Sequence, residues 1–134
     1  MEDKVMESSK VGKSILIALG SNFAQEKNVA YAMEELRTAF PGAVFSEMLW
    51  TEPIGIASDR FVNALGKAST CMSQEQVLLM LKNIERKCGR CEEDKARNII
   101  KLDLDLLQYG DERLKEADWH RDYVLQLLGS DFCL

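Results

Sequence analysis

Two aspartates one residue apart are the strongest chemical signal in the sequence. Asp103 and Asp105 alternate with leucines through residues 102–106. Because successive side chains of a β-strand point to opposite faces, both carboxylates are expected on one face and the leucines on the other. The two aspartate Cα atoms would lie roughly 6.6–6.8 Å apart. Carboxylates this close repel each other, and Mg²⁺, which binds one or two carboxylates together with substrate phosphates, would relieve the repulsion.

Positive side chains lie just ahead of this run. Arg90 and Arg97 belong to the charged segment 90–98. Lys101 has the strand parity of Asp103, so it is predicted to point to the same face. Cations beside a metal-binding strand are what phosphoryl transfer needs to neutralise phosphate charge. The simpler alternative is an ordinary sheet with a solvated polar face and a soluble loop, since the same segment carries three acidic residues.

A second group of residues could hold a flat ring. Residues 51–55 form a Thr-x-Pro-x-Gly loop, and Phe61 and Asn63 follow in a β-prone run. An aromatic face can stack on a heterocycle such as a pterin or a purine. The Thr51 hydroxyl and the Asn63 amide can hydrogen-bond the edge of that ring. Taken alone, such residues are more often a plain loop and a core phenylalanine.

Hydrophobic patterning predicts the elements that would position these groups. Apolar runs bounded by turn residues indicate strands, and apolar residues three or four apart indicate helices. Ser73 and Gln76 have the spacing of a capping box at the start of the second helix, and Gly89 is suited to end it. We expect strands at residues 14–20, 43–50, 61–70 and 99–109, helices at 25–40 and between Ser73 and Gly89, a mobile loop at 90–98, and a short helix or strand at 123–128.

The order β-α-β-β-α-β is that of a ferredoxin-like α+β fold, with an antiparallel sheet and both helices packed on one face. A chain of 134 residues fits one domain, expected at 13–134 behind a disordered tail at 1–12. The formal net charge of −5 argues against binding to nucleic acid or an anionic membrane. Because we identify neither a signal peptide nor an apolar run long enough to span a bilayer, we expect a cytoplasmic protein.

Four cysteines, Cys71, Cys88, Cys91 and Cys133, are expected to be free thiols in a reducing compartment. Cys88 and Cys91 form a C-x-x-C pair, which leaves a redox or zinc role open as an alternative. A structural zinc site needs four nitrogen or sulfur ligands, and no second pair stands at ligand spacing. Cys88 also falls on the apolar face of a predicted helix, which favours a packing role.

Five motifs occur in order along the chain: Gly20-Ser21-Asn22, Thr51-x-Pro53-x-Gly55, Phe61-x-Asn63, Ile84-Glu85-x-x-x-Gly89-Arg90, and residues 102–110, which include Asp103, Asp105 and Gly110. In this order and spacing the sequence resembles the 6-hydroxymethyl-7,8-dihydropterin pyrophosphokinase family of the folate pathway. The resemblance runs from about residue 14 to residue 110, and it resumes more weakly at Arg121, Tyr123, Val124 and Leu125.

The resemblance implies a ferredoxin-like fold and transfer of diphosphate from ATP to the pterin hydroxymethyl oxygen, with two Mg²⁺ ions and release of AMP. Asp103 and Asp105 would hold the metals, and Arg90 would belong to the catalytic set, to which strand parity rather than the resemblance adds Lys101. We expect small-molecule partners only, with no nucleic acid or membrane, and a monomer or weak homodimer. The pterin pocket would be lined by Thr51, Ile54, Phe61, Asn63 and Tyr123, and the nucleotide side by Glu85, Arg90, Arg97 and Arg121.

The catalytic segment departs from the family pattern. Ile100 stands where the family has an arginine, and Glu92 stands where it has a second loop arginine. Arginines that stabilise charge in phosphoryl transfer are worth orders of magnitude in rate. Lys101 is the expected substitute. The alternative is a catalytically weakened relative that binds a nucleotide or a pterin, or that serves as an interaction module.

Overall fold

The structure is a computed structural model and describes residues 12–129. Most of the tail expected at 1–12 and Cys133 therefore lie outside the described residues. The strands are β1 (Lys13–Ser21), β2 (Val44–Phe45), β3 (Leu49–Thr51), β4 (Phe61–Thr70), β5 (Asp103–Tyr109) and β6 (Glu112–Arg113). The α-helices are α2 (Gln25–Ala39), α3 (Gln74–Lys87) and α4 (Asp122–Leu128), and the 3-10 helices are η1 (Glu92–Arg97) and η2 (Glu116–His120).

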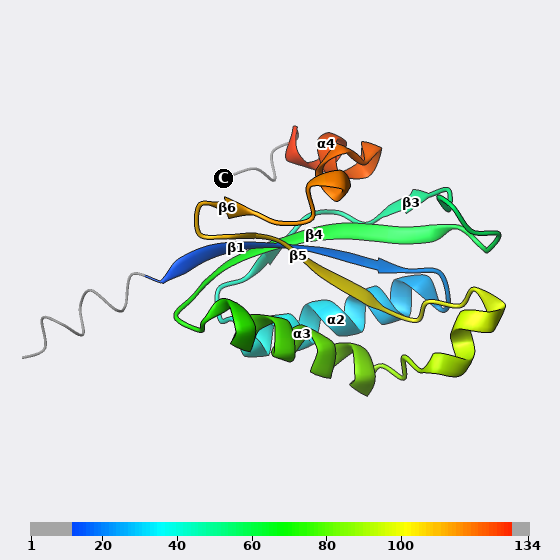
Figure 1. The fold of residues 1–134 in the computed structure, drawn as a ribbon, viewed down its shortest axis with the longest axis horizontal. Helices are drawn as coiled ribbons and strands as arrows, with labels where there is room; N and C mark the ends of the chain where they lie inside the picture. The colour runs from blue at the N-terminus through cyan, green and yellow to red at the C-terminus, as the bar shows by residue number, and fades with distance from the viewer. Residues whose placement is uncertain (1–11, 130–134) are drawn as a thin grey trace, which may run out of the picture.

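The strands form one antiparallel sheet in the order β2-β4-β1-β5-β6, and β3 also pairs with β4. Helices α2 and α3 cover one face of the sheet, whereas α4 and η2 lie over the other (Figure 1). This arrangement confirms the predicted α+β, ferredoxin-like fold with the two long helices on one face. The segment predicted as a short helix or strand at 123–128 is helix α4.

The central strand β1 is buried on both of its faces. Ile15 and Ile17 belong to the core formed with α2 and α3. Leu16 and Ala18 point the other way and belong to a second cluster with Trp119 of η2. Burial on both faces explains why the strand reads as a continuous apolar run rather than an alternating one.

The run at 43–50 forms two short strands rather than the single strand that the sequence predicts. Ser46 separates them, because its backbone N–H donates to the carbonyl of Leu65 (2.8 Å) and its hydroxyl oxygen accepts from the N–H of Leu65 (2.9 Å). A side chain thus replaces one hydrogen bond of the strand ladder, and pairing with β4 resumes in β3. Serine side chains compete with backbone pairing in this way, which hydrophobic patterning does not reveal.

The segment at 90–98 also differs from the prediction, because it contains the 3-10 helix η1 instead of a loop without regular structure. A 3-10 turn needs only short i to i+3 hydrogen bonds and no apolar stripe. The N–H of Asn98 donates such a bond to the carbonyl of Lys95 (3.0 Å), and Asn98 ends the helix with a φ of 55°. The following strand begins at Asp103 rather than at residue 99.

Helix α3 begins with the predicted capping box, in which the Gln76 N–H donates to the Ser73 hydroxyl (3.2 Å) and the Ser73 N–H donates to Gln76 Oε1 (2.9 Å). The substitution Ser73→Ala removes the acceptor of a helix-terminal N–H and should lower the free energy of unfolding by about 1 kcal/mol. Urea denaturation followed by circular dichroism measures this loss. Ser69→Ala, at an exposed position of β4, is the matched control, and an equal effect of both substitutions would contradict the prediction.

Candidate active site

Asp103 and Asp105 lie on one face of β5, as strand alternation predicts. Asp103 is opposite Gly20 of β1, and Asp105 is opposite Ala18. Leu104, between them, points into the core under α2 and α3. β6 pairs only with the last two residues of β5, so the aspartates belong to the half of β5 whose outer edge has no partner strand among the described residues.

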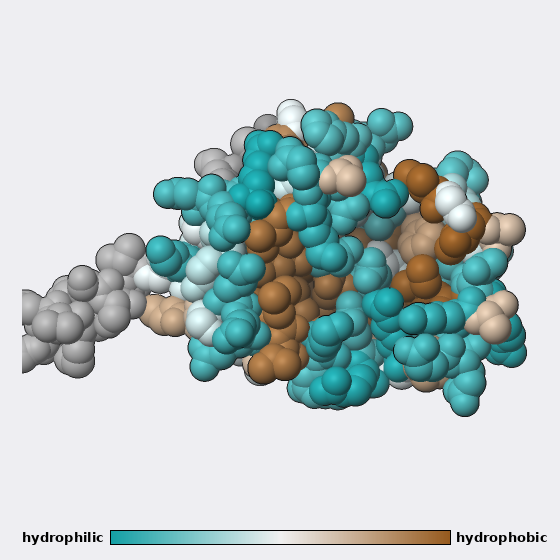
Figure 2. Space-filling model, viewed as in Figure 1, coloured by the Kyte–Doolittle hydropathy of each residue, from teal (hydrophilic) through white to brown (hydrophobic). Residues whose placement is uncertain are grey.

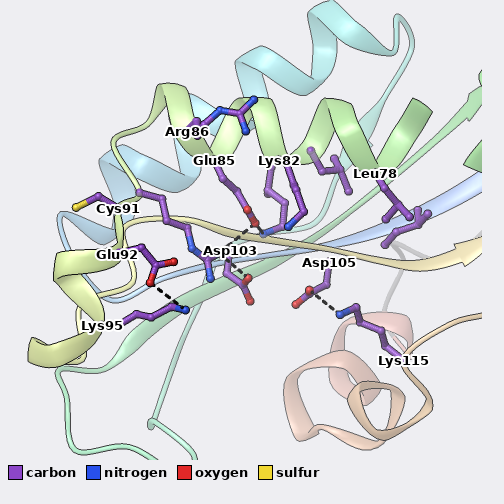
Figure 3. A pocket seen from close by; sticks show the side chains of 14 residues that line it. Leu78, Lys82, Glu85, Arg86, Cys91, Glu92, Lys95, Asp103, Asp105 and Lys115 are labelled. Carbon is purple, nitrogen blue, oxygen red and sulfur yellow. Dashed lines mark hydrogen bonds and ion pairs between the residues drawn. The ribbon is translucent and has the colours of Figure 1, made fainter. Parts of the chain in front are cut away.

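A groove of about 810 Å³ runs between this open edge of β5 and helix α3 (Figure 3). Leucines of both elements form its apolar wall, which belongs to the hydrophobic band visible over α3 and β5 in Figure 2. Apolar surface beside a charged rim suits an anionic ligand that has an uncharged part. The charged residues that line the groove are Lys82, Glu85, Arg86, Arg90, Glu92, Lys95, Asp103, Asp105 and Lys115.

Each aspartate has one cation of the chain beside it. Nη1 of Arg90 is 3.0 Å from Oδ1 of Asp103, and it also donates to the carbonyl of Leu102 (3.1 Å). Nζ of Lys115 is 3.4 Å from Oδ1 of Asp105 (Figure 3). Arg90 is thus where the sequence placed it, next to the carboxylate pair. Lys115 was missed, because it is brought to Asp105 only when the chain reverses through β6 into η2.

Glu85 connects helix α3 to the open edge of β5. Its Oε2 atom accepts a hydrogen bond from the backbone N–H of Leu104 (2.7 Å) and lies 3.2 Å from Nη1 of Arg90. Burial raises the pKa of Glu85, and the hydrogen bond from Leu104 partly opposes that rise. Glu85 was expected on the nucleotide side, and the structure puts it in the groove wall, where it orients Arg90.

Having both carboxylates ionised at once is electrostatically unfavourable in this partly buried site. Burial, followed by repulsion from Asp103, raises the pKa of Asp105 from 3.8 to about 7, although Lys115 partly offsets the rise. A cation at the pair would remove this penalty. No cluster of three or more candidate metal-ligating side chains occurs within residues 12–129. The two carboxylates would supply only one or two ligands to a Mg²⁺ ion, and phosphate and water would have to complete its shell.

The predicted ring-binding residues lie on the same face of the sheet, across Gly20. Gly20 is paired with Asn63 of β4 on one side and with Asp103 of β5 on the other, so the three residues form one row. The Thr51 hydroxyl donates to Oδ1 of Asn63 (2.6 Å), and Nδ2 of Asn63 donates to the carbonyl of Leu19 (3.3 Å). A Cβ atom at Gly20 would lie 2.7 Å from Nδ2 of Asn63, so only glycine leaves room for this amide.

The other three predicted ring-binding residues come from different parts of the chain: β4, the loop between β3 and β4, and α4. Phe61 pairs with Thr51 and has the strand parity of Asn63. Ile54, in the loop between β3 and β4, is exposed. Tyr123 lies on α4, where burial and then the Asp105 carboxylate raise the pKa of its hydroxyl. None of these residues lines the groove between β5 and α3. Asn63 lies on the sheet face that carries Asp103 and Asp105, whereas α3 covers the opposite face, so the groove and the ring-binding set meet at the carboxylate pair on the edge strand.

Lys101 does not point toward the aspartates. Its Nζ atom lies 3.3 Å from Oδ2 of Asp94 and 3.3 Å from the carbonyl oxygen of Gly89. The prediction from strand parity is wrong here, because β5 begins only at Asp103 and the alternation does not extend back to Lys101.

Two further residues predicted on the nucleotide side also lie outside the groove. Arg97 is exposed at the end of η1. Arg121 is directed to η2, where its Nε atom is 3.2 Å from Oδ1 of Asp118. Arg90 is therefore the one arginine of the predicted set that lines the groove within the described part of the chain.

The C-x-x-C pair has no feature of a reactive site. Cys88 follows α3, is half-buried and packs against the main core, as predicted. Burial raises the pKa of its thiol, which disfavours the nucleophilic thiolate. Cys88 and Cys91 form no disulfide, and Cys91 is exposed.

Comparison with known proteins identifies the family. The sequence model of the 7,8-dihydro-6-hydroxymethylpterin-pyrophosphokinase (HPPK) family matches residues 16–130. This chain belongs to the HPPK family. The match includes most of β1 and all of β4 and β5, which carry the carboxylate pair and part of the ring-binding set, so the family assignment and the site rest on the same part of the chain.

Two curated relatives from Arabidopsis thaliana are similar over most of the HPPK-family chain. A folate synthesis bifunctional protein is 31% identical over 134 residues, which cover 89% of this chain and 28% of the relative. A mitochondrial folate synthesis bifunctional protein is 33% identical over 143 residues, covering 93% of this chain and 25% of the relative. The chain thus spans about a quarter of the length of these relatives. Among residues 12–129, each helix is too short or too polar to traverse a bilayer.

The substitution Asp105→Asn tests the electrostatics of the carboxylate pair. Because the pKa of Asp105 rises from 3.8 to about 7 on folding, the folded protein retains a proton between these pH values that the unfolded chain releases. The carboxyl therefore lowers stability as the pH rises through this window. Without divalent cations, we expect Tm of the variant to exceed that of the natural protein by about 3–8 °C at pH 8 and to converge with it near pH 4.

Differential scanning calorimetry in the presence of a chelator measures this difference. Asp111→Asn, at an exposed position in the turn between β5 and β6, is the control and should leave the pH dependence unchanged. Parallel pH profiles for the natural protein and Asp105→Asn would contradict the prediction.

Proposed function

We propose that this protein transfers diphosphate from ATP to the hydroxymethyl group of 6-hydroxymethyl-7,8-dihydropterin, with release of AMP, in folate biosynthesis. One observation carries the proposal: Asp103 and Asn63 flank Gly20 in register on one face of the sheet. A polyphosphate bound at Asp103 would lie about two strand spacings, or ~10 Å, from a ring bound at Asn63. Membership of the HPPK family supports this pair of substrates.

The groove between β5 and α3 is the proposed site of ATP. Leucines in its wall suit the adenosine part of ATP, and five positive side chains suit the triphosphate. The five are Lys82, Arg86, Arg90, Lys95 and Lys115. Asp103 and Asp105 would hold two Mg²⁺ ions, which when bound neutralise and orient the phosphates.

Arg90 and Lys115 are the proposed cations for the developing charge. They now pair with Asp103 and Asp105, and cations bound at those carboxylates would leave both side chains free for phosphate oxygens. In the reaction, the pterin hydroxymethyl oxygen bonds to the β-phosphorus, the bond from that phosphorus to the AMP oxygen breaks, and the hydroxyl proton passes to solvent. Fixed positive charge at the transferred group stabilises such a transition state.

The ring-binding set would hold the pterin. The hydrogen bond from Thr51 and the contact with Leu19 fix the amide of Asn63, so that it presents a defined donor and acceptor. Phe61 would stack on the ring, with Ile54 and Tyr123 completing the pocket. A fixed ring would place its hydroxymethyl arm toward the phosphates, which supplies the proximity that this transfer depends on.

A weakened relative is the second candidate function. Glu92 pairs with Lys95 (3.5 Å) at a position where the resemblance implies an arginine, and Ile100 supplies no charge at another. Loss of both arginines would slow the transfer while leaving the groove and the ring-binding set in place.

An assay of AMP formation from ATP, 6-hydroxymethyl-7,8-dihydropterin and Mg²⁺ tests the proposed activity. We expect AMP to form, and Asp103→Asn to lower kcat/KM at least about 100-fold because one carboxylate and the charge partner of Arg90 are lost. Asp111→Asn should retain the activity.

Absence of AMP above a blank at high enzyme concentration would exclude the transfer. Calorimetry then separates the candidates: binding of both Mg·ATP and the pterin without turnover would identify the weakened relative.

The substitution Gly20→Ala tests where the pterin binds. The added methyl group would meet Nδ2 of Asn63 at 2.7 Å and displace the amide. We expect KM for the pterin to rise about tenfold, since a hydrogen bond to the ring is lost, with KM for ATP changing less than about twofold. Ser14→Ala, exposed near the other end of β1, is the control, and an unchanged pterin KM in Gly20→Ala would contradict this placement.

A further inference from the structure

The 3-10 helix η1 contains a carboxylate that is largely removed from solvent. The side chain of Asp94 is 10% exposed, although the neighbouring acidic residues of the segment face water. No hydrogen bond of good geometry reaches its Oδ2 atom within the described residues, but the ammonium of Lys101 lies 3.3 Å away. A buried carboxylate depends on such a partner, because burial without compensation is costly.

Lys101 contacts three separate segments of the chain. Its ammonium is paired with Asp94 in η1 and donates to the carbonyl of Gly89 at the end of α3 (3.3 Å). The same ammonium lies 5.9 Å from the ring centroid of Phe23, in the turn after β1. Gly89 directly precedes Arg90, so Lys101 is linked to the residue that presents the groove arginine.

The far end of the segment is held by different, uncharged contacts. Nδ2 of Asn22 donates to the carbonyl of Asn98 (2.8 Å), and Oδ1 of Asn22 accepts from the N–H of Ile100 (2.6 Å). Asn98 in turn donates to the carbonyl of Ala57 (3.2 Å), in the loop that carries Ile54. These hydrogen bonds fix residues 98–100, whereas the ion pair of Lys101 fixes the middle of the segment and its junction with α3.

We propose that Lys101 is a positioning residue: through its ion pair with Asp94 it holds η1 against the end of α3 and so keeps Arg90 in the groove, without itself contacting the triphosphate. The link to ATP rests on the proposed function, whereas the packing role does not. This role replaces the direct contact with phosphate that strand parity suggested for Lys101.

A buried ion pair gives a distinctive pattern of substitutions. Removing one partner leaves an uncompensated charge, whereas removing both partners together is close to neutral. Lys101→Met should therefore loosen η1, and the double variant Asp94→Asn/Lys101→Met should restore it. A lysine that contacted phosphate would behave differently, because loss of Asp94 could not compensate for loss of its charge.

Hydrogen exchange measured by mass spectrometry on the whole chain, without ligands, tests the packing role. We expect exchange of the amides at 91–99 to accelerate about tenfold or more in Lys101→Met, and to return to within about twofold of the natural protein in Asp94→Asn/Lys101→Met and in Lys101→Arg. Lys87→Met, which breaks the more exposed pair between Lys87 and Glu35, is the matched control and should leave these amides unchanged.

Binding of Mg·ATP by calorimetry tests the consequence for the groove. Lys101→Met should weaken binding about tenfold, and the double variant should recover most of the loss. Unchanged exchange in Lys101→Met, or a double variant as defective as Lys101→Met, would overturn the proposal. Should Lys101→Met fail to fold, the double variant decides alone, since natural exchange and binding in it support the proposal and defects in either overturn it.

The two proposals can fail separately. Absence of AMP formation by the natural protein would remove the proposed activity and leave the exchange results unaffected. Normal AMP formation together with unchanged exchange in Lys101→Met would remove the positioning role alone.

Discussion

Repulsion between two carboxylates on one face of β5 is the constraint that organises this site. Asp103 and Asp105 are held together by the pleat of the strand, and burial makes their shared negative charge unfavourable. The chain compensates with one cation for each, Arg90 from the end of α3 and Lys115 from the start of η2. Because the negative charge of the two carboxylates is neutralised only by side chains that can move away, other cations can replace Arg90 and Lys115 at the pair. A ligand that combines a metal ion with phosphate requires this property.

The face shared by Asp103 and Asp105 could be predicted from the sequence because a strand has a period of two. The same rule failed for Lys101, since the start of β5 is set by contacts with the end of β1, where the N–H of Asn22 donates to the carbonyl of Ile100 (3.0 Å). Lys115 could not be predicted beside Asp105, because no local pattern marks the chain reversal that brings them together. Sequence periodicity thus predicts the orientation of residues within an element but not the contacts between distant segments.

A third layer, on the face of the sheet opposite α2 and α3, was not predicted from the sequence. Leu16 and Ala18 are apolar at positions that would face solvent in a two-layer protein, and this indicates burial on both faces. The cover is η2 and α4, where the indole N–H of Trp119 donates to the carbonyls of Leu107 (3.0 Å) and Leu114 (3.1 Å). These contacts join η2 to β5 and to the residue that follows β6, and their spacing has no periodic signature.

The half-open edge of β5 also affects the tendency of the protein to self-associate. An unpaired strand edge is a template for intermolecular pairing and aggregation. Here the outward N–H of Leu104 is taken by the Glu85 carboxylate, and the outward carbonyl of Leu102 is taken by the Arg90 guanidinium. Glu85 and Arg90 therefore also block the addition of a further strand to this edge. Resistance to aggregation and the shape of the groove depend on the same two side chains.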